Sequence, residues 1–192
     1  LGDVYKRQTP WEEKISILEK YGIEVCIWSD FSDIKNLKAD NFIKYLIKKG
    51  VESFVVGFNF RFGKNREGDI KSLKKLSEKY NFSVNVIEPV KIDGEIVNAS
   101  KIRQFIKKGE IEKSNKFLGR YFSFKGKVIK GSLRGRIIGF PTANILPDYK
   151  VEVGEGVYAG YVLYKDKFRK AAINIGPPVT FGEREKRIEV HI

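Results

Sequence analysis

Residues 131–144 read GSLRGRIIGFPTAN, and this stretch is the most informative in the chain. Glycine lets the backbone adopt positive φ and approach a phosphate closely, and arginine offers a charged, planar fork of donors to phosphate oxygens. The residues of those two types are Gly131, Gly135 and Gly139 with Arg134 and Arg136. They precede Pro141, Thr142, Ala143 and Asn144. The combination is typical of a phosphate-binding loop.

The end of this stretch adds a possible metal site. The hydroxyl of Thr142 and the amide oxygen of Asn144 are hard oxygen ligands of the kind that Mg²⁺ accepts while keeping most of its water. Together with the glycines and arginines they predict a site for a magnesium nucleotide. An ordinary basic turn between two strands is the simpler interpretation of an isolated motif this short, so the rest of the chain has to decide.

The wider pattern decides it. GRIIGFPTANI (135–145) is followed by GVYAGYV (156–162), NIG-x-x-V-TFG (174–182) and IEVHI (188–192). This series resembles the riboflavin kinase module of the bifunctional riboflavin kinase/FMN adenylyltransferases, the bacterial FAD synthetases. Upstream, VVGFNFRFGKNREGDI (55–70) and VNASKIRQFIKKGEI (97–111) are similar to two adenylyltransferase segments of the same family. The resemblance extends from Thr9 to Ile192.

The resemblance implies two domains. Residues 9–118 are expected to form an α/β Rossmann-like nucleotidyltransferase domain without its N-terminal part. Residues 119–192 are expected to form a small antiparallel β-barrel, the riboflavin kinase domain, without its C-terminal part. The parent protein of such a chain phosphorylates riboflavin to FMN with ATP and adenylates FMN to FAD with a second ATP. Residues 1–8, LGDVYKRQ, match nothing in the family and are expected to be non-native.

In the first module the resemblance places Gly57 and Asn59 in the nucleotide site, and Ser100 and Arg103 on ATP phosphates at a helix start. A helix N-terminus offers free N–H groups and partial positive charge, although Arg103 equally fits a solvated helix cation. Asn98-Ala99 replaces two hydroxyl residues of the family pattern. The family's H-x-G-H motif cannot be present, because His191 is the single histidine. We therefore expect no FMN adenylation by this chain.

In the second module the resemblance implies a magnesium nucleotide site with one catalytic carboxylate. Thr142 and Asn144 would meet Mg²⁺, and Glu189 would be the base. Strand alternation puts Glu189 and His191 on one face, although a solvent-exposed face with a satisfied histidine fits the same pattern. Val179 replaces a family proline. The nucleotide-binding residues that the resemblance implies are Gly131, Arg134, Gly135, Arg136, Gly139, Pro141, Thr142, Gly156 and Tyr158.

Local patterns predict the elements of both modules. Thr9-Pro10-Trp11-Glu12 begins a helix that stops at Gly22, and an apolar strand is expected at 23–28 with Cys26 buried in it. Further helices are expected through Phe42–Ile47, Ile70–Leu76, 100–108 and 110–118. A buried strand is expected at 53–57 and a further strand at 83–87. Strand and helix alternate to this point, which favours a parallel sheet, with loop 58–68 at the carboxyl ends of its strands. Antiparallel strands are then expected at 121–129, 158–164 and 168–175.

Composition limits the alternatives. The formal net charge is +13, and 42% of the 192 residues are hydrophobic, as in a folded protein. A single cysteine excludes an internal disulfide, and nothing resembles a signal peptide or membrane span, which points to the cytoplasm. The charge attracts polyanions. A basic, non-catalytic nucleic-acid-binding protein that stacks bases on Phe58, Phe60 and Phe62 is therefore the alternative, although no nucleic-acid-reading motif supports it.

Overall fold

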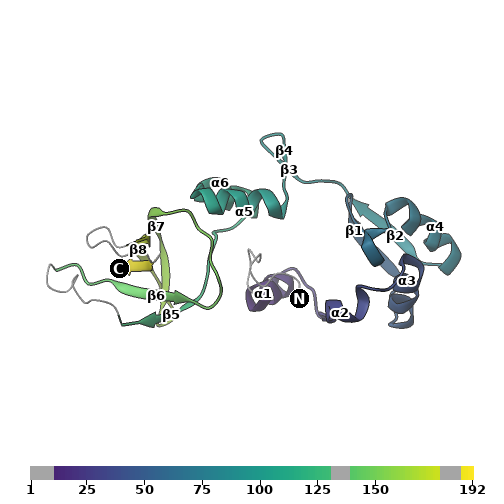
Figure 1. Cartoon of the computed structure of the whole chain (residues 1–192), viewed down its shortest axis with the longest axis horizontal. Coiled ribbons are helices and arrows are strands. Elements are labelled where there is room, and N and C mark those ends of the chain that lie inside the picture. The colour runs from purple at the N-terminus through teal and green to yellow at the C-terminus, as the bar shows by residue number, and fades with distance from the viewer. Residues whose placement is uncertain (1–10, 131–138, 178–186) are drawn as a thin grey trace. The chain divides into compact units, whose positions relative to one another are not determined.

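The computed structural model describes residues 11–130, 139–177 and 187–192 (Figure 1). Contacts divide the chain into two compact units. The first unit contains Ile15–Val97. The second contains Asn98–Ile192 together with the first turn of helix α1, up to Lys14.

The first unit is an α/β unit around two parallel strands. Its elements in chain order are α1 (Trp11–Lys20), which begins in the second unit, α2 (Phe31–Ile34), α3 (Ala39–Lys48), β1 (Ser53–Gly57), a 3-10 helix (Lys64–Arg66), α4 (Ile70–Tyr80), β2 (Ser83–Ile87), β3 (Lys91–Ile92) and β4 (Glu95–Ile96). β1 and β2 pair in parallel from Ser53–Ser83 to Gly57–Ile87. The predicted positions of both strands are confirmed, and loop 58–68 does follow the carboxyl end of β1.

The core of this unit lies between the strands and helices α3 and α4. Ile43, Phe54, Phe62, Leu73 and Phe82 form it, and the rings of Phe54 and Phe82 are 4.7 Å apart. The predicted α3 and α4 are confirmed, because the apolar spacing of each sequence gives one face to this core. Strand β1 is less buried than predicted. Only Phe54 of β1 is buried, and Val55 on its other face is 67% exposed.

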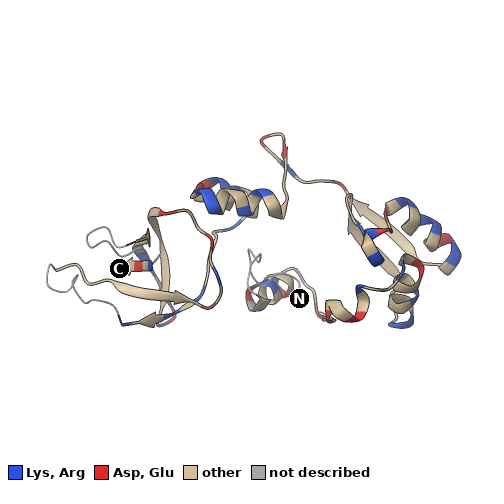
Figure 2. Cartoon of the chain, viewed as in Figure 1, with Lys and Arg blue, Asp and Glu red and all other residues tan. Residues whose placement is uncertain are grey.

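Lys, Arg, Asp and Glu residues occur along both α3 and α4 (Figure 2). Asp40 of α3 is bound by Lys44 at 2.9 Å, by Lys79 at 3.0 Å, and by the Tyr80 hydroxyl at 2.8 Å. The hydrogen bonds from Lys44, Tyr80 and Lys79 hold the pKa of Asp40 well below its ordinary range. These contacts join the two helices at the surface.

The loop after β1 is held by contacts of its own residues and by a hydrogen bond to α3. The Phe62 ring covers Gly68, where an added Cβ would lie 2.7 Å from the ring, and Phe62 is only 5% exposed. Glu67 accepts a hydrogen bond from the Ala39 amide at 2.7 Å and so ties the loop to the start of α3. Because Phe62 is part of the core, it is not available to stack on a base, and the base-stacking interpretation is wrong at this residue.

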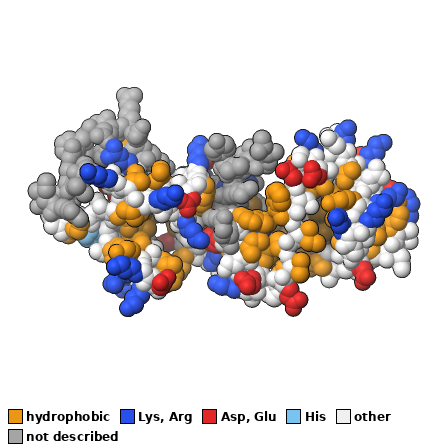
Figure 3. All heavy atoms as spheres, turned by 90° about the horizontal axis from the view of Figure 1, so that it is seen from below, with side chains coloured by type: hydrophobic (Ala, Val, Ile, Leu, Met, Phe, Trp, Pro, Cys, Tyr) orange, Lys and Arg blue, Asp and Glu red, His pale blue; other side chains and the backbone are white. Residues whose placement is uncertain are grey.

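The segment between α1 and α2 differs from the sequence prediction. Residues 23–28 form no strand, and Val25, Ile27 and Trp28 are 74%, 76% and 68% exposed. Cys26, predicted to be buried, is exposed. Hydrophobic side chains gather on the surface in this part of the molecule (Figure 3). A strand needs a neighbour for its backbone groups, and this segment pairs with no strand in the described part of the chain.

The second unit combines a helical pair with an antiparallel sheet. Its elements are α5 (Ala99–Lys108), α6 (Ile111–Leu118), β5 (Gly126–Ile129), β6 (Ala143–Pro147), β7 (Gly156–Tyr164), β8 (Lys167–Gly176) and β9 (Arg187–His191). The sheet order is β5-β6-β9-β8-β7. The predicted 100–108 and 110–118 helices are confirmed, with Gly109 between them at φ +77°. β5 is shorter than predicted, since residues 121–125 are not in a strand.

The two faces of this sheet differ in burial. Register pairing puts Ile188, Val190 and Ile175 on one face, where all three are buried. The other face bears Asn144, Glu189 and His191, together with exposed residues such as Val157. The β7–β8 hairpin turns at Lys165 and Asp166, as predicted from the sequence. Both residues have positive φ, which a two-residue hairpin turn of this kind requires.

Within the second unit, the turn between helices α5 and α6 makes a close backbone contact with the segment before β7. The Gly154 amide donates to the Ile106 carbonyl at 2.9 Å. The Tyr158 hydroxyl donates to the Gly154 carbonyl at 2.7 Å, and a Cβ on Gly109 would lie 2.6 Å from that hydroxyl. Glycine at 109 therefore serves both the left-handed backbone and the close approach of β7.

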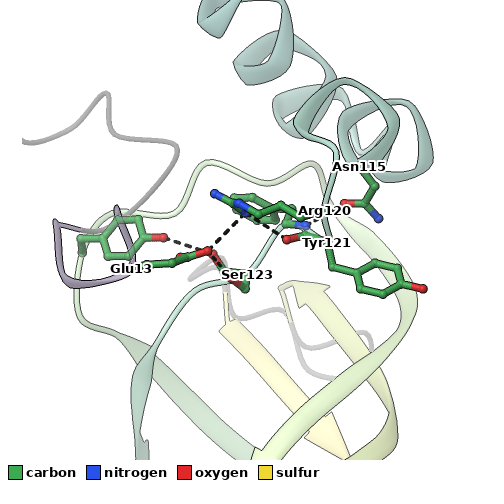
Figure 4. Close-up of polar contacts among 7 residues, drawn as sticks. Glu13, Asn115, Arg120, Tyr121 and Ser123 are labelled. Carbon is green, nitrogen blue, oxygen red and sulfur yellow. Dashed lines mark hydrogen bonds and ion pairs between the residues drawn. The ribbon is translucent and has the colours of Figure 1, made fainter. Parts of the chain in front are cut away.

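The first turn of α1 also contacts this unit (Figure 4). Glu13 accepts from Arg120 at 3.2 Å and from the Ser123 hydroxyl at 3.1 Å. Asn115 accepts from the Phe122 amide at 2.7 Å. Together these bonds hold the connection between α6 and β5. No helix in the described residues is long and apolar enough to cross a membrane.

Candidate functional site

The candidate site is built around the start of β6. Gly139 has φ +81°, a left-handed conformation that glycine adopts without strain, and it turns the chain into Phe140, Pro141 and Thr142. Pro141 and Thr142 are exposed, and β6 begins one residue later at Ala143. The predicted ligands Thr142 and Asn144 therefore flank the first residue of the strand.

Asn144 and Glu189 come together on the open face of the sheet. They are direct register partners on β6 and β9, and Glu189 is also the register partner of Asn174 on β8. Directly opposed residues of an antiparallel pair have Cβ atoms about 5 Å apart and point to the same face. Asn144 is 9% exposed, while Glu189 and Asn174 are half-buried. The result is a carboxylate between two amides.

His191 lies on the same face as Glu189, as strand alternation predicts. Its Nδ1 is 2.8 Å from the Pro141 carbonyl oxygen, and its ring is 5.6 Å from that of Phe140 in an edge-on arrangement. The histidine thus has a hydrogen-bond partner, as the plainer interpretation of this strand proposed. That partner belongs to the predicted nucleotide loop.

Other predicted kinase residues lie elsewhere. Tyr158 is on the opposite face from Asn144, with its hydroxyl bound to Gly154, and burial raises the pKa of this phenol. Gly156 begins the same strand, at the Gly156–Ile175 pair. The sheet therefore separates the Tyr158 side chain from the Asn144–Glu189 pair. Gly131, Arg134, Gly135 and Arg136, and also Val179, lie outside the described residues.

Of the predicted adenylyltransferase residues, the structure brings two together. Ser100 and Arg103 lie in the first turns of α5, where the Arg103 guanidinium donates to the Ser100 hydroxyl at 3.1 Å. Asn98 caps this helix by accepting from the Lys101 amide at 2.9 Å. The residue that replaces a family hydroxyl thus satisfies one of the free N–H groups of the helix start.

Gly57 and Asn59 lie in the first unit, at the carboxyl end of β1. Both are exposed, and a Cβ on Gly57 would lie 3.6 Å from the Asn59 side-chain oxygen. The Asn59 side chain therefore folds back over Gly57.

The donor set suits a magnesium ion shared with phosphate. Within the described residues, no three His, Cys, Asp or Glu side chains cluster in a way that could hold a metal. Thr142 and Asn144 instead offer one hydroxyl and one amide oxygen, beside the Glu189 carboxylate. Mg²⁺ commonly takes few protein ligands and completes its shell with water and substrate phosphates, so these residues fit that ion.

A shallow cavity of about 470 Å³ adjoins this face. Its lining residues are Tyr121, Ala159, Gly160, Tyr161, Lys170, Ala171, Ala172, His191 and Ile192. The Tyr121 and Tyr161 ring centroids are 6.1 Å apart. The cavity is mostly apolar and shares His191 with the candidate site.

Sequence reasoning missed Asn174, the second neighbour of Glu189. The available signal was a lone amide in the apolar run Ala171-Ala-Ile-Asn-Ile175. Register was needed to see its importance, because β8 and β9 are separated by residues 177–186 in the chain.

Comparison with known proteins shows which family the chain belongs to. A family model described as FAD synthetase matches residues 4–101, and one described as riboflavin kinase matches residues 118–192. Two similar curated proteins are bifunctional riboflavin kinase/FMN adenylyltransferases. The one from Buchnera aphidicola subsp. Schizaphis graminum is 32% identical over 97% of this chain, and the one from Escherichia coli K12 is 33% identical over 97%. This chain covers 62% and 61% of their lengths.

A solved structure has a similar fold. It is described as a macrolide-efflux protein from Streptococcus pneumoniae, and it matches with a TM-score of 0.85 at 30% identity. The match covers 96% of this chain and 60% of that one. The efflux description applies to the S. pneumoniae protein, and the likeness concerns the fold.

Proposed function

Because this chain belongs to the FAD synthetase family, we propose that it serves flavin cofactor synthesis, with residues 119–192 as the riboflavin kinase module and residues 9–118 as the adenylyltransferase module. The proposal extends to a Rossmann-like first domain and a β-barrel second domain. The parallel β1–β2 pair and the five-stranded antiparallel sheet support those assignments.

The observation that supports the kinase proposal most directly is the Asn144–Glu189 pair. Phosphoryl transfer needs a positioned nucleotide and a group that orients the attacking hydroxyl. Asn144 and Thr142 are proposed to hold the nucleotide end of the site. Glu189, on the adjacent strand, is proposed to accept a hydrogen bond from the riboflavin 5′-hydroxyl and then its proton.

Thr142 and Asn144 are the residues proposed to hold Mg²⁺, which when bound would neutralise charge on the ATP phosphates. The protein side chains also have a role that does not depend on the metal. Asn144 is held in the strand ladder and is largely buried, so its amide has little freedom. The amides of Asn144 and Asn174 flank the carboxylate of Glu189, and we propose that they keep it directed along the sheet face.

For the first module we propose nucleotide binding without adenylation. Ser100 and Arg103 at the start of α5 are proposed to contact phosphates. Gly57 and Asn59 are proposed as nucleotide-binding residues of the first unit. The H-x-G-H motif is absent from the sequence, and preorganised donors of that kind often supply the largest catalytic contribution. FAD production by the purified chain at the rate of an intact enzyme would contradict this proposal.

The decisive experiment is calorimetric titration of the chain with ADP, with and without Mg²⁺. We expect magnesium-dependent binding that Asn144→Ala removes. The matched control is Asn85→Ala, an exposed amide on β2 of the other unit, and this variant should bind as wild type does. If the chain is folded by circular dichroism and still fails to bind, the working nucleotide site does not exist in this chain.

A further inference from the structure

The contact between His191 and Pro141 identifies which ring nitrogen is protonated. A carbonyl oxygen only accepts hydrogen bonds, so the 2.8 Å contact requires that Nδ1 of His191 is the donor. In the neutral ring, Nε2 is then the unprotonated nitrogen. The edge-on contact with Phe140 fits the same ring plane.

This bond joins the segment before β6 to the last residue of β9. Among the described residues, β6 and β9 share the register pairs Ala143–Val190 and Asn144–Glu189. Pro141 precedes β6 by two residues and has no N–H to donate to a ladder. The His191 side chain therefore extends the β6–β9 connection beyond the end of the strand pairing.

The two residues joined by this bond lie close in sequence to the proposed metal ligand and the proposed base. Pro141 immediately precedes Thr142, and His191 is two residues from Glu189 on the same face. A displacement of Pro141 would move Thr142 relative to Glu189, because Thr142 is the next residue in the chain.

We propose that His191 is a positioning residue for the kinase site. Its Nδ1–H holds the Pro141 carbonyl and thereby sets Thr142 at a fixed place beside Asn144 and Glu189. This inference rests on the proposed function of those residues. His191 itself takes no proton from the substrate in this scheme.

The chain allows an unambiguous first test, because His191 is its only histidine. A long-range ¹H–¹⁵N spectrum at about pH 8.5, where an ordinary imidazole is neutral, reports the tautomer directly. We expect the proton on Nδ1. A proton on Nε2, or a mixture of tautomers in free exchange, would overturn the proposal, whatever the nucleotide-binding result.

The second test measures ADP binding with Mg²⁺ in two variants. His191→Leu removes the donor, and we expect binding about five- to tenfold weaker, the effect of one lost hydrogen bond. His191→Asn puts an amide N–H as many bonds from the backbone as Nδ1, and we expect it to restore binding to within about twofold of wild type. Lys167→Gln, at the hairpin end of β8, is the control and should change nothing.

The outcomes separate the two proposals. Normal binding by a folded His191→Leu, with binding lost in Asn144→Ala, would leave the kinase site standing and overturn the role of His191. Equal loss in His191→Leu and His191→Asn would also overturn it, since the donor would not be what matters. No binding by wild type would remove the kinase site and with it the positioning role.

Discussion

Glu189 lies directly between two amide side chains, Asn144 on β6 and Asn174 on β8, in one row across three adjacent strands. Side chains in such a row share a face of the sheet, so the carboxylate has an amide residue as its neighbour on each adjacent strand. The arrangement depends on strands from three separate parts of the chain. The pairing of these strands places three polar residues side by side on one face of the sheet.

Replacing the carboxylate should separate catalysis from binding. In Glu189→Gln we expect the riboflavin kinase turnover number to fall by about 10²–10⁴-fold, the usual contribution of a general base. ADP affinity in the presence of Mg²⁺ should stay within about twofold of wild type. Asn144→Ala is the matched contrast, since it should weaken ADP binding itself. Equal turnover of Glu189→Gln and wild type would exclude Glu189 as the base.

Gly109 should tolerate alanine much less well than Gly119. Both glycines end helices at positive φ, +77° and +68°, so alanine at either site costs about 1–2 kcal/mol of unfolding free energy from backbone strain. Only at Gly109 would the new Cβ meet the Tyr158 hydroxyl, at 2.6 Å, while nothing lies within 4 Å at Gly119. We expect a further loss of about 1–3 kcal/mol in Gly109→Ala, measured by urea unfolding.

The cause of that extra loss can be checked with a double variant. If the hydroxyl is responsible, Gly109→Ala combined with Tyr158→Phe should lose less than the sum of the two single changes. Additive losses would show that the Tyr158 hydroxyl is not the cause of the extra loss.

Two aromatic residues of loop 58–68 should respond very differently to truncation. Phe62 is 5% exposed and in the core, so Phe62→Ala should lower the free energy of unfolding by about 3–5 kcal/mol. Phe58 is 41% exposed, and Phe58→Ala should cost about 1 kcal/mol or less. Chemical denaturation followed by circular dichroism measures both. A small effect at Phe62 together with weaker RNA binding would revive the base-stacking interpretation.

Because of Tyr149, we expect the free energy of unfolding to fall between about pH 10 and pH 12. Burial, with the nearby Glu13 charge, raises the pKa of its phenol to about 12. In the unfolded chain this phenol has its ordinary pKa near 10. The contribution of the shift to the free energy of unfolding is therefore fully present below about pH 10. That contribution is lost as the pH rises to about 12. Between these limits, wild type should lose more stability than Tyr149→Phe, as measured by urea unfolding at each pH.

The control for this pH dependence is Tyr21→Phe, because Tyr21 is 82% exposed. That variant should follow the wild-type curve across the same interval. If Tyr149→Phe also follows it, the phenol is not held in the neutral form by the fold.

The sequence was sufficient for elements whose stability is local. Apolar spacing located α3 and α4, and a glycine at positive φ ended the α5 helix where predicted. It was insufficient at residues 23–28, where an apolar, β-branched run is strand-like by composition. Whether such a run becomes a strand depends on a partner for its backbone, and no local pattern contains that information.

The candidate site shows the same division. Alternation along β9 was enough to put Glu189 and His191 on one face. It could not show that Asn174 lies beside Glu189, since that follows from the register of β8 against β9. Nor could it show that Tyr158 faces away from Asn144, because its direction depends on the contact of β7 with Gly154 and the α5–α6 turn.

The exposure of Cys26 has a practical consequence. It is the single thiol of the chain and lies at the surface of the first unit, while the single imidazole, His191, lies in the second. A fluorophore coupled through maleimide chemistry to Cys26 and the nuclear resonances of His191 would each report on one unit without any engineered change. The chain thus contains a natural pair of orthogonal probes, with which the melting of each unit can be followed separately in one sample.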